Sequence, residues 1–218
     1  MLTKELPRKS LVLLVSFALQ LIVTSAAWAI GGYGAGGGTA SGLYSIAIGL
    51  GAETSEFVSV GIGSDVEVSS QMAAALGYKA KVTGWAGLAC GHASAASGGY
   101  STAIGPYAKA LGNNSTAVGG GSDANDTQGA KAVGNDSSAF GVGAHAAGAS
   151  STTSGAYSAA TGVHSAAYGV GARATGANST ASGAYSTSKG VGSAAYGVRS
   201  IAYNDGSIAI GQHSVSGC

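Results

Sequence analysis

The sequence predicts an all-β protein, a parallel β-roll or solenoid of about twelve coils with fourteen residues in each coil. Glycine accounts for 39 of the 218 residues and only 9% of the residues are charged, so small side chains dominate and an ordinary two-layer core cannot be filled. A five-residue pattern, S-x-A-x-G, recurs every seven residues. Two residues that favour turns separate successive copies, and two copies make one coil.

The first 29 residues are expected to be a secretory signal peptide. Lys4, Arg8 and Lys9 supply a positive n-region. Residues 11–26 form an apolar run, and residues 27–29 read A-W-A, which is typical of a cleavage site. An uncleaved membrane anchor is the alternative, although the apolar run is slightly short for a span of about 20 residues. No second apolar span follows, so we expect the mature protein to be exported without a membrane-spanning helix.

The repeats run from 45 to 218, after a glycine-rich lead-in at 30–44. A strong copy at 45–49 reads SIAIG, and weaker copies such as AKVTG at 80–84 lie between the strong ones. The register breaks once, at about 120–129, where GGSDANDTQG holds about eight extra residues. This polar, glycine-rich insertion is expected to be a surface loop, either one that sets binding specificity or a tolerated insertion.

Alternation along each five-residue repeat assigns its side chains to two faces, because strand side chains have a period of two. Places one and three are Ser or Ala almost throughout, so we expect them to face a narrow interior. Places two and four then point outward. In the first half of each coil none of these outward residues is charged, whereas in the second half they include lysine, arginine, glutamate and histidine.

The first halves of the coils therefore present one apolar outer face along the whole solenoid, roughly 58 Å at the usual strand spacing. Such a strip on a soluble protein predicts self-association, normally with closed cyclic symmetry. A covering segment of the same chain is the alternative, but residues 30–44 are too few and too glycine-rich for that. The pattern by itself does not distinguish a dimer from a trimer. The residues expected at this interface are Ile46, Ile48, Val60, Ile62, Leu76, Leu88, Cys90, Ile104, Val118, Phe140, Tyr168, Tyr196, Ile208 and Ile210.

The repeat resembles the head repeat of YadA-like trimeric autotransporter adhesins. Copies at 45–49 and 207–211 read SIAIG, those at 101–105 and 115–119 read STAIG and STAVG, and A-x-A-x-G copies such as AKALG at 108–112 lie between them. The resemblance implies a left-handed parallel β-roll and a homotrimeric head. It would make the apolar face the trimer interface.

The function that this resemblance implies is that of a non-enzymatic bacterial adhesin head, secreted or held at the cell surface. Such heads bind extracellular matrix proteins such as collagen, bind cell surfaces, or cause autoagglutination. A complete family member continues into a coiled-coil stalk and an anchor in the outer membrane of a Gram-negative bacterium. The sequence ends at Cys218 without such segments, so we expect a truncated chain, or a head that is released or held by another partner.

No pattern in the sequence predicts a catalytic, cofactor-binding or metal site. The four histidines, His92, His145, His164 and His213, have no carboxylate or cysteine at ligand spacing. No basic block predicts nucleic-acid binding. Two other non-enzymatic functions stay open. They are a structural or ice-binding solenoid, suggested by threonines that recur on the apolar face, and a segment of a phage or appendage fibre.

Seven residues on the charged face or at its edge are candidate contacts for a ligand, because tyrosine and arginine are common at interfaces. These candidates are Tyr107, Lys109, Lys131, His145, Tyr157, Arg173 and Tyr185. The tyrosines come just before a repeat, so we expect them at the edge of the roll, where packing over the turns is the alternative role. Cys90 is expected to be a buried, inert thiol, and Cys218 is a candidate for crosslinking two chains.

Overall fold

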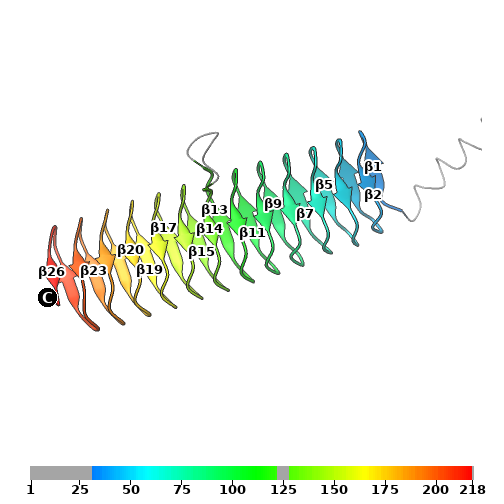
Figure 1. The fold of residues 1–218 in the computed structure, drawn as a ribbon. Helices are drawn as coiled ribbons and strands as arrows, with labels where there is room; N and C mark the ends of the chain where they lie inside the picture. The colour runs from blue at the N-terminus through cyan, green and yellow to red at the C-terminus, as the bar shows by residue number, and fades with distance from the viewer. Residues whose placement is uncertain (1–30, 122–127, 218) are drawn as a thin grey trace, which may run out of the picture.

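The chain winds into an elongated solenoid made of two parallel sheets, seen in a computed structural model that describes residues 31–121 and 128–217 (Figure 1). Each coil gives one strand to each sheet, and the coils stack in sequence order from the N-terminal to the C-terminal end. The all-β parallel solenoid predicted from the sequence is confirmed. The expected signal peptide and Cys218 lie outside the described residues.

The described residues form thirteen strands in each sheet. Sheet A contains β1 (Tyr33–Ala35), β3 (Ile46–Ile48), β5 (Val60–Ile62), β7 (Ala74–Leu76), β9 (Leu88–Cys90), β11 (Thr102–Ile104), β13 (Thr116–Val118), β15 (Ser138–Phe140), β17 (Thr152–Ser154), β19 (Ala166–Tyr168), β21 (Thr180–Ser182), β23 (Ala194–Tyr196) and β25 (Ile208–Ile210). Sheet B contains β2 (Thr39–Ala40), β4 (Glu53–Thr54), β6 (Glu67–Val68), β8 (Lys81–Val82), β10 (Ala95–Ala96), β12 (Lys109–Ala110), β14 (Lys131–Ala132), β16 (His145–Ala146), β18 (Ala159–Ala160), β20 (Arg173–Ala174), β22 (Thr187–Ser188), β24 (Ile201–Ala202) and β26 (Val215–Ser216).

The structure has about thirteen coils, one more than the sequence predicts, because part of the glycine-rich lead-in forms a coil of its own. Tyr33 in β1 pairs with Ile46 in β3, an offset of 13 residues (46 − 33), whereas the later coils without an insertion have an offset of 14, as between Ile46 and Val60 (60 − 46). In this first coil, Gly34 pairs with Ala47 of the next coil. Gly32 takes the place that Ser45 has in the next coil, two residues earlier. The shorter offset and the missing serine and alanine explain why the pattern did not reveal this coil.

The insertion leaves the strand register unchanged. Thr116 in β13 pairs with Ser138 in β15, an offset of 22 residues (138 − 116), so eight residues are added to the usual 14. On sheet B, Lys109 in β12 pairs with Lys131 in β14. The extra residues therefore lie outside both ladders. Of this insertion, residues 122–127 lie outside the described part of the chain.

Small side chains fill the space between the two sheets, as the alternation of each repeat predicts. Ala47, Ala103 and Ala110 have no exposed surface, and the serines at place one are buried beside them. Ser45 Oγ donates a hydrogen bond to the carbonyl oxygen of Gly42 at 2.6 Å, and Ser165 Oγ does the same to Gly162. These two serines thus satisfy their buried hydroxyls within their own turns. Other place-one serines do not, since the buried hydroxyls of Ser101, Ser115, Ser151, Ser179 and Ser207 have no hydrogen-bond partner among the described residues.

The glycine that ends each repeat has a different physical role in the two halves of a coil. Gly49, which ends a first-half repeat, has a φ of +123°, a region that side chains with a Cβ rarely adopt. Gly98 ends a second-half repeat, and a Cβ there would collide with the backbone of Gly112 in the next coil. Glycine is therefore favoured once for backbone conformation and once for the close stacking of coils. The second requirement is not absolute, because Glu56, Ser70 and Asn204 end three of the second-half repeats.

Where larger side chains occupy the interior, a smaller residue faces them. Val66 and Val68 are buried between the sheets, and the facing place-three position holds Gly61 where most coils have alanine. A Cβ at Gly61 would lie 2.9 Å from Thr54 Cγ2 and 3.2 Å from Val66 Cγ1. The interior of this coil therefore has no free space for a methyl group at Gly61.

We expect Gly61→Ala to lower the free energy of unfolding by about 1–3 kcal/mol, because the added methyl group overpacks the interior. Thr54→Ser removes the nearest carbon atom, so the double variant Gly61→Ala/Thr54→Ser should recover part of the loss. Chemical denaturation at one fixed protein concentration measures both effects. Strictly additive losses from the two substitutions would contradict this account of the packing.

Candidate functional site

The outer face of sheet A holds every residue expected at the assembly interface. All fourteen lie at outward-facing places of sheet A strands. Ile104 and Phe140 are about two-fifths exposed (39% and 41%), whereas Val60, Leu88, Cys90 and others are half-buried by neighbouring coils. Ile210, on the last strand of the sheet, reaches 73% exposure because no described coil stacks on it.

No charged residue lies on this outer face within the described strands of sheet A. Thirteen strands are separated by twelve steps, so the uncharged strip is about 58 Å long at the usual strand spacing. An apolar surface of this length is typical of a protein–protein interface. Sheet A therefore offers a flat docking face with no charge to position a small ligand.

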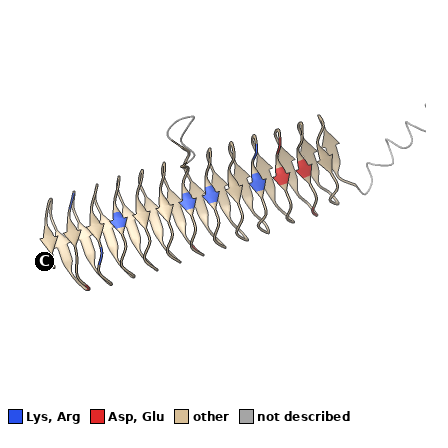
Figure 2. Ribbon diagram, viewed as in Figure 1, with Lys and Arg blue, Asp and Glu red and all other residues tan. Residues whose placement is uncertain are grey.

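The outer face of sheet B carries the charges, and they are sorted along the solenoid (Figure 2). Glu53 in β4 and Glu67 in β6 lie toward the N-terminal end, followed by Lys81 in β8. Lys81 Nζ forms an ion pair with Glu67 Oε2 at 2.8 Å. Beyond β8 the charged residues at this place of the described strands are all basic.

Four of these residues form a row that we call the basic row. The basic row consists of Lys109 in β12, Lys131 in β14, His145 in β16 and Arg173 in β20. Lys109 pairs in register with Lys131, and Lys131 with His145. Ala159 in β18 separates His145 from Arg173, so the row extends over four strand steps, about 19 Å.

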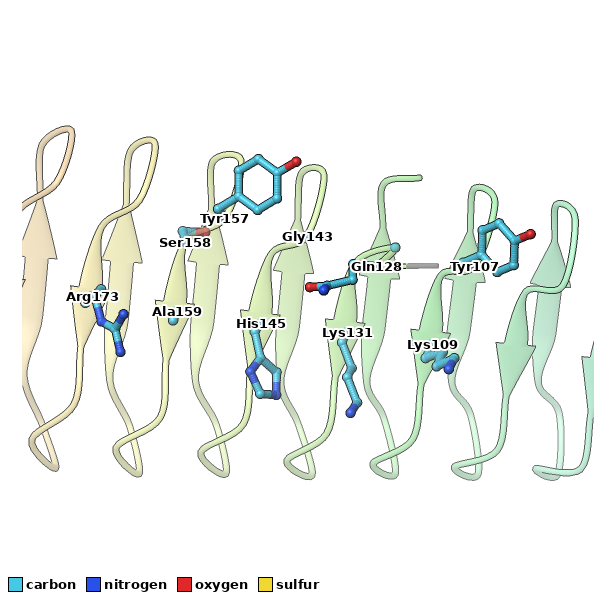
Figure 3. A pocket seen from close by; sticks show the side chains of 11 residues that line it. Tyr107, Lys109, Gln128, Lys131, Gly143, His145, Tyr157, Ser158, Ala159 and Arg173 are labelled. Atoms are coloured by element: carbon cyan, nitrogen blue, oxygen red, sulfur yellow. The ribbon is translucent and has the colours of Figure 1, made fainter. Parts of the chain in front are cut away.

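A groove of about 580 Å³ runs along the basic row (Figure 3). Six of the seven candidate ligand contacts line it, namely Tyr107, Lys109, Lys131, His145, Tyr157 and Arg173. Tyr185 does not line the groove. It belongs to the coil after Arg173, and its ring lies beside Gly171. The rest of the lining consists of residues that no sequence pattern singles out, namely Gln128, Gly129, Gly143, Ser158 and Ala159.

The glycines among these missed residues create the opening at the edge of the groove. Gly129 and Gly143 occupy, in two successive coils, the turn place that Tyr107 and Tyr157 occupy on either side. The ring of Tyr157 lies against Gly143, since a Cβ there would come within 2.7 Å of the ring atom Cδ1. The run Tyr, Gly, Gly, Tyr at one place of successive repeats is the sequence signal that would have revealed the gap.

Aromatic side chains line the same turn edge toward the N-terminal side. The rings of His92 and Tyr107 have centroids 5.0 Å apart, and His92 also contacts Tyr78 edge-on at 5.2 Å. The Nζ atom of Lys79 lies 5.0 Å from the centroid of the Tyr78 ring. These contacts hold Tyr107 at one end of the groove, so packing over turns and lining the groove are both roles of this tyrosine.

His145 is the titratable group at the centre of the basic row. Partial burial, and secondly the positive charge of Lys131, hold its pKa below the usual value of 6.5. The folded state therefore takes up this proton less readily than the unfolded state. As the pH falls below 6.5 toward the folded-state pKa, this group makes the protein less stable, and above 6.5 it makes no difference.

We expect Lys131→Gln to raise the pKa of His145, while leaving it below 6.5 because burial remains the larger cause. A titration of the imidazole C–H signals by NMR measures this pKa. Lys189 directly follows β22 and lies outside the groove, so Lys189→Gln is the control and should leave the pKa of His145 unchanged. A pKa at or above 6.5 in the unmodified protein would contradict the expected direction.

The described residues contain no group of three or more His, Cys, Asp or Glu side chains arranged to hold a metal ion. Cys90 is a free thiol at an outward-facing place of β9 and is only half-buried, so it is less enclosed within one chain than expected. No helix in the described part of the chain is long and apolar enough to span a membrane.

A family model described as the YadA head domain repeat, in two copies, matches residues 39–55, 96–122, 160–186 and 188–214. This chain carries YadA head domain repeats. The coils between the matched segments keep the same register, so the YadA head repeats form part of one continuous solenoid. Repeats of this family come from adhesins, which are typically non-enzymatic. A search of curated protein sequences found no match.

Proposed function

We propose that this protein acts as a homotrimeric adhesin head that binds extracellular matrix proteins or cell surfaces, or links bacterial cells to one another. The observation that carries the proposal is the uncharged outer face of sheet A in a chain built of YadA head repeats. Its site of action would be the bacterial surface or the extracellular medium. The proposal involves no catalysis and no cofactor.

Three copies placed with sheet A toward a common axis would cover their apolar strips and leave sheet B at the surface. A strip about 58 Å long gives each copy a continuous contact with its two neighbours. Closed three-fold symmetry satisfies all three strips at once, with no open edge for further association. In this arrangement the basic row and its groove face outward on every subunit.

The oligomeric state tests this assembly. We expect the purified protein to scatter light with three times the mass of one chain. Ile104→Lys places a charge in the middle of the sheet A face and should yield monomers, because a buried, unpaired ammonium group strongly disfavours association. Thr83→Lys, an exposed position on sheet B, is the matched control and should remain trimeric. A folded monomer of the unmodified protein would remove the physical basis of the proposal.

Binding to immobilised collagen, other matrix proteins and cultured cells tests the adhesive role. We expect saturable binding of the trimer to at least one of these surfaces. The monomeric Ile104→Lys variant should bind at least tenfold more weakly, because it lacks the avidity of three linked sites. No binding to any matrix protein or cell, and no clumping of bacteria that display the protein, would refute the adhesin function.

The structure offers little support for an ice-binding role. An ice-binding face needs an unbroken, regular row of threonines open to water. The threonines of sheet A are interrupted, because Ser138 lies between Thr116 and Thr152 in the ladder, and Ala166 follows Thr152. This row also lies on the face proposed for assembly.

A further inference from the structure

We propose that the groove on sheet B binds a linear sulfated polysaccharide, with the sulfate groups along the basic row. This inference deepens the proposed adhesin function by naming the chemical class of one ligand. It does not require the trimer, since every residue of the groove belongs to one chain. The argument rests on the charge, the spacing and the shape of the groove.

The positive charge of the basic row is not neutralised within the described residues. The ion pair found there joins Lys81 to Glu67, further along the same face, and reaches none of the groove residues. Lys109 and Lys131 lie on adjacent strands with their backbones in register, so two like charges are held side by side. The charge of Lys131 also acts on His145, where it adds to the larger effect of burial in lowering the pKa. A bound polyanion would relieve it.

The spacing of the charges indicates a linear ligand. The basic row follows the axis of the solenoid for about 19 Å (Figure 3). Lys109 and Lys131 lie on adjacent strands, the imidazole of His145 follows on the next strand, and Arg173 lies two strands further on. A single phosphate or carboxylate would reach one or two of these side chains. A chain that carries a negative charge on successive units would reach all of them and follow the same axis.

The remaining lining of the groove is suited to sugar rings. Tyr157, half-exposed beside Gly143, presents an aromatic ring and a hydroxyl group at the edge of the groove. Gly129, Gly143 and Ala159 have no side chain that would block a close approach to the sheet. A lining of basic, aromatic and small residues suits the charged groups and the rings of such a polysaccharide, which we therefore favour over a protein ligand.

Heparin is the probe for this site, with chemically desulfated heparin as the comparison. We expect the purified protein to bind heparin near physiological ionic strength and to be released as salt is raised, because exposed charge pairs are screened. Lys109→Ala/Lys131→Ala should bind heparin about tenfold more weakly. Lys81→Ala/Lys189→Ala removes the same charge from the same sheet outside the groove, and should bind like the unmodified protein.

A pair of tyrosine variants separates the groove from general surface charge. Tyr157 and Tyr185 lie against Gly143 and Gly171 in nearly the same way, but only Tyr157 lines the groove. We expect Tyr157→Ala to weaken heparin binding several-fold and Tyr185→Ala to leave it unchanged. Circular dichroism and light scattering check that all variants keep the fold and the assembly of the unmodified protein.

The inference would be overturned by any of three results. These are no heparin binding by the unmodified protein, equal losses in the groove variants and their matched controls, and equal affinity for desulfated heparin. Competition by an acidic protein but not by heparin would also overturn it and assign the groove to a protein ligand. If heparin binding fails while binding to matrix proteins or cells persists, the adhesin function stands and this assignment of the groove falls.

Discussion

The rest of the structure depends on the close, parallel stacking of very short coils. Successive coils lie one strand spacing apart, about 4.8 Å, and the two sheets of each coil enclose a space that admits little more than alanine and serine. Gly98 shows how tight this stacking is, since even a methyl group there would collide with the backbone of the next coil. Stability must therefore come from many repeated small contacts and ladder hydrogen bonds rather than from a few large side chains.

Because no fully buried side chain is larger than valine, the aromatic and charged side chains of the described residues lie outside. The two sheets use this freedom differently. Sheet A keeps an uncharged, largely apolar outer surface, whereas sheet B carries glutamates, lysines, His145 and Arg173. A solenoid with one uncharged and one charged face is suited to assemble through the first and to contact other molecules through the second. This division underlies both the proposed trimer and the proposed ligand groove.

The groove arises from the register of the coils rather than from any folded pocket. Lys109 and Lys131 are separated by 22 residues, yet they are direct neighbours because the insertion adds its extra length outside the ladder. The same register stacks Tyr107, Gly129, Gly143 and Tyr157 at one turn place, so that two glycines open a gap between two tyrosines. A surface feature that spans several coils can thus be changed by substitutions that leave the interior untouched.

The sequence by itself determined the solenoid, the inward and outward faces of each repeat, and the contrast between sheets A and B, because all three follow from a side-chain period of two. It missed the first coil, where glycines replace the serine and alanine of the pattern and the offset is one residue shorter. Seven ligand candidates were selected from the sequence one by one, and six of them line the groove. Only the tertiary structure gathered them into one groove, because residues become neighbours there through coil-to-coil register, which repeat composition alone does not express.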